Sequence, residues 1–336
     1  MSTASVSTDA VGSAGRGAGG VLAVAVLRRI GVFVLTVLVA SLVVFALLNV
    51  LPGDVARAQL GMNASDADVA QFRAEHGLDR PLPVQYLGWI TGFLTGDMGT
   101  SYSSRTPVAL QVFDALQVSL ILVGAGILIA VLIALPLGTL AAVRQNRPDG
   151  ALLSALSQVG IAVPNFLAGL LLISIFAVGL GWLPSGGWTA PAEGFGDFLR
   201  QLTLPALALG LVRGAILSRY TRAAVLEVMR EDFMRTARAK GLMPAAALRR
   251  HGLRNALVPV VTVTSVEFSA LVIGAVVIET VFVIPGLGSL LMRAVDNRDL
   301  IQVQAIVMCV VVLVLLVNLL VDITRTLIDP RLRSTR

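Results

Sequence analysis

The feature that most constrains this chain is a series of apolar runs, each about as long as a bilayer is thick. A transmembrane helix needs about 20 consecutive apolar residues. Hydrophobic residues make up 56% of the chain and charged residues 14%, whereas a soluble domain has about 25% charged residues. The sequence predicts an all-α integral membrane protein with six transmembrane helices. The predicted spans are Ile30–Leu51, Leu116–Val143, Leu152–Leu183, Leu202–Tyr220, Ala256–Ile284 and Val303–Ile323.

The third run is too long for one straight helix, and it contains Pro164 and several glycines. Proline removes a helical hydrogen bond and clashes with the preceding turn. Irregular backbone at membrane depth is tolerated where it is covered by protein or lines a cavity. We therefore expect a kink or a break near Pro164-Asn165.

The distribution of charge predicts which loops face the cytoplasm. Residues 219–254 carry nine basic residues against three acids, whereas residues 54–114 carry seven acids against four arginines. Cytoplasmic loops collect Lys and Arg. Both termini and the loop 222–255 are therefore predicted to be cytoplasmic, and the loop 53–115 extracytoplasmic.

Three segments follow from this topology. We expect a disordered cytoplasmic tail at residues 1–26, because its first 20 residues are rich in Ser, Ala and Gly. A membrane domain follows at 27–331, and a short C-terminal tail at 332–336. The net charge of +6 and the isoelectric point near 10.6 come from arginines at membrane edges, where anionic lipid attracts them. This favours membrane lipids over nucleic acid as the partner of the basic residues.

The chain lacks the residues of an energy-converting or metal site. Lys240 is the only lysine and follows Ala239, so the Gly-Lys-Ser/Thr of a phosphate-binding loop cannot form. His76 and His251 are predicted to lie on opposite sides of the membrane, which argues against a His or Cys/His metal site. Cys309 is the only cysteine. We expect a non-catalytic chain without cofactor or metal, driven by another chain or by an ion gradient.

Three polar residues inside the predicted spans, Asn165, Glu267 and Glu279, are candidates for a translocation path. Ionisable groups at bilayer depth are costly and face protein or water. Glu267 and Glu279 lie twelve residues apart, about 120° around a helix, so they do not form one paired site. Each either lines a path or is a buried carboxylate bonded to a neighbouring helix. Glu279 is near the outer end, where water could reach it. Arg213 could pair with Glu267, and Asn165 is a path candidate because it follows the helix break.

The extracytoplasmic loop shows signs of folded structure. Residues 63–66 resemble a helix start, since Ser or Asp can accept the free amide bonds of a first turn. Residues 80–83 contain two prolines that interrupt a helix. Residues 85–94 predict an amphipathic helix whose Tyr86 and Trp89 suit the membrane surface. This loop is either a platform for an extracytoplasmic partner or a solvated lid.

The cytoplasmic loop predicts two short helices. Residues 222–240 are helix formers without Gly or Pro. Gly241 suits the left-handed position just beyond a helix end, and Pro244 suits the first turn of a second helix that ends at Arg250. The loop is either gripped by a partner or lies as an amphipathic stretch on anionic lipid.

Several motifs agree in order and spacing over about Ile30–Arg331. They are Leu51-Pro52-Gly53-Asp54, Gly77-Leu78-Asp79-Arg80-Pro81, Gly96-Asp97-Met98-Gly99-Thr100-Ser101, Ala162-Val163-Pro164-Asn165-Phe166, Arg235–Leu242 with His251–Pro259, and Ile278–Phe282 with Pro285-Gly286-Leu287-Gly288. With these motifs the chain resembles the inner-membrane permeases of bacterial ABC importers, in the peptide/nickel group that includes dipeptide and oligopeptide permease B subunits.

The resemblance implies a type I ABC importer permease fold in the bacterial inner membrane. It implies a second homologous permease chain, two ATP-binding cassette subunits that use ATP and Mg, and an extracytoplasmic solute-binding protein. The cytoplasmic loop would dock on the ATP-binding subunit, although its Arg235-Thr236-Ala237 replaces the Glu-Ala-Ala of the general importer loop.

Site residues follow from this comparison. The docking residues would be Arg235, Thr236, Ala237, Lys240, Gly241, Leu242, Met243, Leu248 and His251. The apolar anchors that usually dominate an interface would be Met234, Leu242, Met243 and Leu248. The residues on the binding-protein side would be Asp54, Asp79 and Asp97.

The function implied is ATP-driven import of dipeptides or oligopeptides. Nickel chelates, glutathione and haem are alternative cargoes in the same family. A secondary transporter would favour inverted repeats and midplane carboxylates, and no repeat is evident. A membrane-embedded enzyme is disfavoured because HExxH and GxSxG patterns are missing. An exporter would not need the extracytoplasmic loop as a platform.

Overall fold

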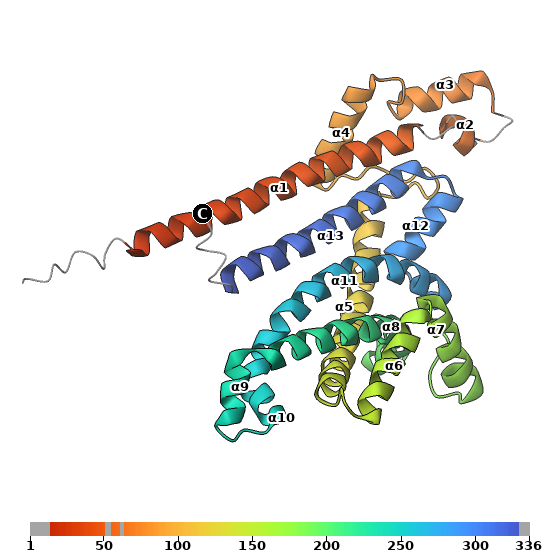
Figure 1. Cartoon of the computed structure of the whole chain (residues 1–336). Helices are drawn as coiled ribbons and strands as arrows, with labels where there is room; N and C mark the ends of the chain where they lie inside the picture. The colour runs from red at the N-terminus through yellow and green to blue at the C-terminus, as the bar shows by residue number, and fades with distance from the viewer. Residues whose placement is uncertain (1–13, 51–54, 61–63, 329–336) are drawn as a thin grey trace, which may run out of the picture.

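The computed structural model describes residues 14–50, 55–60 and 64–328, which fold almost entirely into helices (Figure 1). Within these ranges the one β-type pairing is the isolated bridge between Thr100 and Pro107. The helices, with η marking π-helical turns, are α1 (Ala14–Val50), α2 (Val55–Leu60), α3 (Asp66–Glu75), α4 (Leu82–Thr95), α5 (Val108–Val143), α6 (Pro148–Ala162), α7 (Asn165–Leu172), η2 (Ile173–Gly179), α8 (Phe195–Arg230), α9 (Asp232–Ala239), α10 (Pro244–Ala247), η3 (Leu248–Gly252), α11 (Leu253–Val281), α12 (Leu287–Asp296) and α13 (Leu300–Ile328).

The predicted set of six spans is present. Five helices of the described chain are long and apolar enough to cross a membrane, and the bent pair from Pro148 to Gly179 supplies the sixth when its two arms count as one span. The pair bends by 101° at Pro164, which has an extended backbone between α6 and α7. The predicted break is therefore confirmed, and proline is its cause.

Three helix boundaries differ from the prediction. Helix α8 continues to Arg230, so the predicted helix 222–240 breaks at Glu231 instead of starting after the span. Strong helix formers past Tyr220 let the span continue beyond its apolar part. The predicted helix 244–250 merges into α11, and Ala245–Val281 runs as one long apolar helix. High helix propensity therefore extends the helices of both spans, α8 and α11, beyond their apolar parts and into the loop that joins them.

The N-terminal prediction is wrong from Ala14 onward. Helix α1 begins at Ala14, within the segment 1–26 that was expected to be disordered. The apolar residues Val21–Val26 extend the helix of the first span backwards, and the helix continues through the four glycines of residues 14–20. Residues 1–13 of the predicted N-terminal tail, and the predicted C-terminal tail 332–336, lie outside the described residues.

The loop between the first two spans contains three short helices in its described part, α2, α3 and α4. Ser65 caps α3 and forms a capping box with Asp68, which confirms the predicted start. Helix α4 begins after Pro81, as the prolines indicated. The rings of Tyr86 and Trp89 pack on Phe45 of α1 at centroid distances of 5.5 and 6.1 Å. The placement of these two residues at the membrane surface stays a prediction.

The central contact of the bundle joins α5 and α8, the most extensive helix pair of the described chain. A Cβ atom on Gly138 would lie 2.5 Å from the carbonyl oxygen of Ser218, and one on Gly210 would lie 2.5 Å from Ile129. Gly214 follows Gly210 by four residues and also faces α5. Small residues at this spacing let membrane helices approach closely, and van der Waals packing then holds them together.

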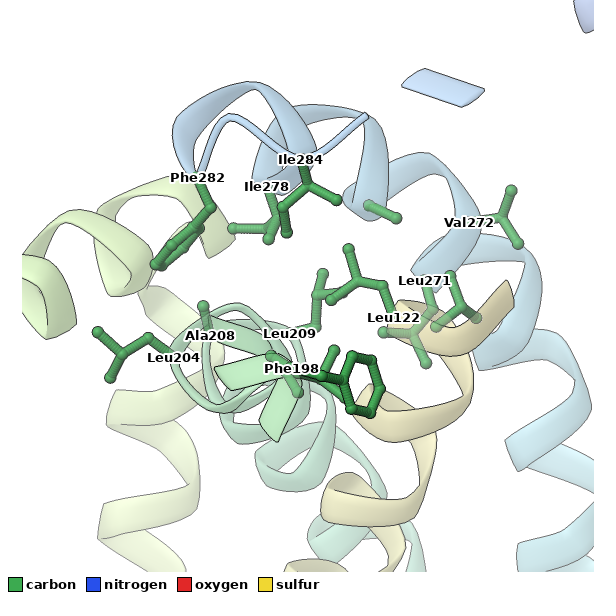
Figure 2. Close-up of a cluster of buried hydrophobic side chains, with 14 residues drawn as sticks. Leu122, Phe198, Leu204, Ala208, Leu209, Leu271, Val272, Ile278, Phe282 and Ile284 are labelled. Atoms are coloured by element: carbon green, nitrogen blue, oxygen red, sulfur yellow. The ribbon is translucent and has the colours of Figure 1, made fainter. Parts of the chain in front are cut away.

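Helix α11 closes an apolar cluster against α5 and α8. Leu122 of α5, Leu209 of α8 and Leu271 of α11 are fully buried, and Figure 2 shows side chains of the three helices pointing toward one another. Arg213 lies one turn after Leu209, and Glu267 one turn before Leu271. The two ionisable residues therefore lie at the edge of the apolar cluster.

Smaller clusters close the two ends of the bundle. One joins Met98, the start of α5, α12 and the start of α13. The other joins the ends of α5 and α8 to α9, α10 and the start of α11. Helices α2–α4 and α12 consequently lie at one end of the molecule and α9–α10 at the other (Figure 1). The acidic and basic loops are thus on opposite ends, and their assignment to the two sides of the membrane stays a prediction from charge.

Helix α1 lies at the edge of the bundle. It packs mainly along α13, beside which it runs in Figure 1. Leu27, Leu35 and Leu47 are between 62% and 66% exposed, so most of its apolar surface is free to meet lipid or another chain. The lipid-facing residues of a span need no polar partner.

We predict that Gly138→Ala lowers the free energy of unfolding by about 1–3 kcal/mol, because the new methyl group would overlap the α8 backbone. Thermal unfolding of the purified protein in detergent measures the change. Gly124→Ala is the matched control on the same helix, since nothing lies within 4 Å of a Cβ there. That variant should be neutral or more stable by up to about 1 kcal/mol. Equal effects of the two substitutions would contradict the close-packing argument.

Candidate functional site

The basic loop predicted to be cytoplasmic turns sharply at Gly241, whose φ is +89°. The N–H of Gly241 donates to the carbonyl of Arg238 at 2.9 Å. The N–H of Leu242 donates to the carbonyl of Ala237 at 3.3 Å. Together these bonds form the Schellman ending, which satisfies carbonyls left free at a helix terminus. The predicted left-handed glycine is confirmed.

One face of the loop is fastened to the spans of its own chain. Met234 is 1% exposed and Leu248 is 3% exposed, and both pack with Ala142 of α5 and Val225 of α8. Leu242 packs against the same cluster. The interpretation of Met234 and Leu248 as free anchors for a partner is therefore wrong. Ala237, on the predicted docking list, is buried as well.

The opposite face carries two exposed apolar side chains among exposed cations. Met243 is 77% exposed and Phe233 is 39% exposed. An open hollow of about 510 Å³ lies next to this face, between the end of α8 and the start of α9. The other exposed residues of the predicted list are Arg235, Thr236, Lys240, Gly241 and His251. The sequence analysis did not select Phe233. Neighbouring residues of a helix point about 100° apart, so a Phe233 next to a buried Met234 would be expected to point away from the core.

The loop continues into α11 through the π-helical turn η3. Gly252 makes the turn possible, because a Cβ there would lie 2.9 Å from Leu248 and 3.1 Å from Val228. Ala245–Val281 consequently forms one membrane-long helix. π-helical turns inside helices are frequent at functional sites.

Arg213 and Glu267 form an ion pair between α8 and α11. The guanidinium Nη1 lies 3.0 Å from Glu267 Oε2, and Nη2 donates to the carbonyl of Ala270 at 3.2 Å. Glu267 is midway along α11, about 21 Å from either end. The side chains keep 17% and 13% of their surface exposed. The pairing foreseen from the sequence is present, near the middle of the spans.

Glu279 serves a different role, because it is 1% exposed. Its carboxylate accepts hydrogen bonds from Gly288 N–H at 2.7 Å and from Ser289 N–H at 3.3 Å. It also accepts one from Ser119 Oγ at 2.6 Å, and that hydroxyl accepts from Leu287 N–H. Glu279 and Ser119 thus cap the start of α12 from two other helices.

The capping geometry corrects the expectation that water reaches Glu279. A carboxylate closed into a helix start cannot line a path in this conformation. It also explains the glycines of the Pro285–Gly288 motif. A Cβ atom on Gly286 would collide with the Glu279 carboxylate, and one on Gly288 would collide with Val276. The sequence signal that could have predicted the cap is a carboxylate shortly before a glycine-flanked helix start.

Asn165 lies at the first position of α7, half-buried, and reaches α11. Its Nδ2 would be 2.7 Å from a Cβ placed on Gly274. Gly274 lies between the levels of Glu267 and Glu279 on that helix. The broken span therefore meets α11 near the ion pair, and the side chain of Asn165 is brought to the same helix as both carboxylates.

The extracytoplasmic end has its own buried carboxylate. Asp299 is 0% exposed and accepts hydrogen bonds from Ser101 Oγ at 2.5 Å and from Ser103 N–H at 3.2 Å. Its other oxygen accepts from Gln302 N–H and caps α13. Burial, and then the charge of Asp299, raise the pKa of Tyr102 to about 12. Sequence reasoning missed Asp299, which ties the loop after α4 to α12 and α13.

Two of the three residues expected on the binding-protein side are described. Asp79 and Asp97 are exposed, and Asp97 Oδ1 accepts from Gly99 N–H at 3.0 Å to shape the turn after α4. Asp54 lies outside the described residues. Phe72 and His76 of α3 pack against the Tyr102 ring at 5.4 and 5.0 Å, so α3 and the turn form one structural unit.

Comparison with known proteins places this architecture in a family. Residues 134–334 match the model of the inner membrane component of binding-protein-dependent transport systems. Residues 22–123 match the model of the N-terminal part of the same membrane component. The chain belongs to this family of transport permeases. It is a multi-pass inner-membrane permease of an ABC importer.

Similar proteins extend over nearly the whole permease. The glutathione transport system permease protein GsiC of Salmonella paratyphi A is 40% identical over 308 residues, covering 92% of this chain and 98% of the relative. A protein of Sinorhizobium fredii named a probable peptide ABC transporter permease is 38% identical and covers 93% of this chain and 100% of its own. The GsiC protein of Pectobacterium atrosepticum is 38% identical, with 91% and 98% covered. The prediction of an ABC importer permease is therefore confirmed.

We predict that Glu279→Ala lowers the free energy of unfolding of the permease by about 2–4 kcal/mol, because it leaves buried N–H donors of α12 without an acceptor. Thermal unfolding in detergent measures the loss. The free energy of unfolding of Glu279→Gln should lie between those of the unchanged protein and Glu279→Ala. The glutamine oxygen can still accept one hydrogen bond, whereas its amide nitrogen faces other donors. The control is Glu193→Ala at an exposed glutamate, which should change little. A Glu279→Ala variant as stable as this control would contradict the capping role.

Proposed function

We propose that this permease imports peptides, delivered by an extracytoplasmic solute-binding protein, as one of two permease chains joined to two ATP-binding cassette subunits. ATP and Mg stay with those subunits, and this chain performs no chemistry. The observation that carries the proposal is the identity of 38–40% with permeases named for glutathione and for peptides, over more than 90% of this chain.

Glutathione is the second candidate cargo, because two of these relatives are named for it. Glutathione is itself a tripeptide with a free amine and free carboxylates, so both cargoes share the same chemical groups. The relatives described above are named for glutathione and for peptides, and not for nickel chelates or haem. Peptides, with glutathione among them, are therefore the favoured class.

The cytoplasmic loop is the proposed docking element for the ATP-binding subunit. Its inner face is held by the permease's own spans, and its outer face offers Phe233 and Met243 with exposed cations around them. Apolar anchors framed by polar residues are typical of energetic hot spots in interfaces. The excess of basic residues in this loop supports a cytoplasmic location, with both termini on the same side.

The path for substrate is proposed to pass the midplane of α8 and α11. Arg213 and Glu267 are partly exposed there, and ionisable residues at this depth commonly mark substrate pathways. Asn165 of α7 also approaches α11, at Gly274. ATP-driven movement of α9 would tilt α11 through η3 and so alter access to this level. The exposed Asp79 and Asp97, with Asp54, are proposed to lie on the side of the binding protein.

Uptake by the reconstituted transporter tests the cargo. Proteoliposomes that hold the complete complex and its binding protein should accumulate labelled dipeptide, tripeptide or glutathione when ATP is supplied to the side of the ATPase subunits. Omission of the binding protein or of ATP should abolish accumulation. Transport of a nickel chelate or haem with no uptake of any peptide would contradict the proposal.

We predict that Phe233→Ala combined with Met243→Ala weakens association with the ATPase subunit about tenfold, which corresponds to about 1.4 kcal/mol. Co-purification of the two subunits at a series of increasing salt concentrations measures the association. ATP-dependent uptake should fall in parallel, while the amount of inserted permease stays the same.

Met292→Ala provides the matched control for this double variant. Met292 is 46% exposed but lies on α12, at the opposite end of the bundle. The control should leave ATPase association unchanged. Full association of the Phe233/Met243 variant would show that the docking surface is elsewhere.

A further inference from the structure

Helix α4 lies against the apolar part of the first span. Tyr86 Oη and Ser41 Oγ are 2.8 Å apart, and Ser41 belongs to the apolar stretch Val24–Leu47. Ser41 is six residues before Leu47, which places it about 9 Å inside the span. The rings of Tyr86 and Trp89 pack on Phe45, one turn closer to the end. Helix α4 therefore reaches membrane depth.

The composition of α4 suits that depth. Residues Leu82–Thr95 include no charged side chain, although the loop around them is rich in charge. Its polar side chains have partners inside the chain. Gln85 donates to the carbonyls of Leu78 and Arg80, Tyr86 bonds to Ser41, and the hydroxyls of Thr91 and Thr95 donate to carbonyls of α4 itself. Polar groups inside a bilayer need hydrogen-bond partners within the protein, and these side chains have them.

The two faces of α4 are both apolar but differ in exposure. Ile90 is 7% exposed, and Tyr86, Trp89 and Phe93 share its face toward the protein. An adjoining face carries Val84, Leu87 and Leu94, which are 48%, 59% and 75% exposed. These three positions lie within about 80° of one another around the helix. Helix α1, on which α4 packs, also carries exposed apolar side chains, for example Leu42 at 51%.

We propose that α4 is half-inserted in the leaflet on its side of the membrane, with Val84, Leu87 and Leu94 in contact with lipid acyl chains. Its 14 residues extend about 21 Å, too short to cross a hydrocarbon core of about 30 Å. A soluble binding protein is a poor occupant, because this face offers no charge or free polar group to it, whereas α3 next to it is charged. By the charge-based topology the leaflet is the outer one. The proposal does not depend on which substrate is carried.

Nitroxide accessibility tests the proposal in the complete transporter, with its second permease and ATPase subunits, in lipid nanodiscs. Cys309 is the only cysteine of this chain, so Cys309→Ala, with cysteine-free variants of the partner subunits, provides a background in which Leu87→Cys or Leu94→Cys is the sole labelling site. Collision with oxygen, which concentrates in lipid, should exceed collision with a water-soluble nickel complex at both positions by severalfold. The label should resemble one at Leu35→Cys, on the exposed face of α1.

Ala70→Cys on the exposed surface of α3 is the control for water, and it should show the opposite preference. Uptake activity of each labelled complex confirms that the variants fold and assemble. Greater accessibility to the nickel complex at Leu87 and Leu94 would overturn the proposal. Protection of both positions when the binding protein is added, or cross-linking of either to the second permease chain, would overturn it as well.

Discussion

The rest of the structure depends on three shielded carboxylates, each of which requires a donor from another segment of the chain. They meet this requirement by joining elements far apart in sequence. Glu267 binds Arg213 on α8, Glu279 binds Ser119 and the start of α12, and Asp299 binds the turn after α4. Apolar packing fills the bundle, while these bonds determine which helix ends meet.

Helix α11 connects the regions to which function is assigned. It begins at the cytoplasmic loop through η3, carries Glu267 at its middle, and ends at the Glu279 cap beneath α12. Helix α12, which this cap starts, leads to Asp299. The Asp299 carboxylate binds Ser101 in the turn after α4 and the N–H of Gln302 at the start of α13. Contact with an ATPase subunit at one end and with a binding protein at the other would therefore act on a single continuous element, without a flexible joint between them.

Sequence reasoning succeeded where a local rule decides the outcome. The apolar runs, the break at Pro164, the Ser65 cap and the left-handed Gly241 each depend on a few neighbouring residues. It failed where a residue's surroundings come from distant segments. Met234 and Leu248 resemble exposed anchors until the ends of α5 and α8 cover them. Glu279 appears water-accessible until α12 folds onto it. Asp299 carries no local motif at all.

The two carboxylates of α11 point in directions about 120° apart, and each is tied to a different neighbour. Glu267 holds the helix to α8, and Glu279 holds it to α5 and α12. Spinning α11 about its own axis would have to break both sets of bonds at once, since no single rotation preserves either. Tilting or sliding together with its neighbours breaks neither. The helix is therefore restrained from twisting while it stays free to move as part of a rigid group.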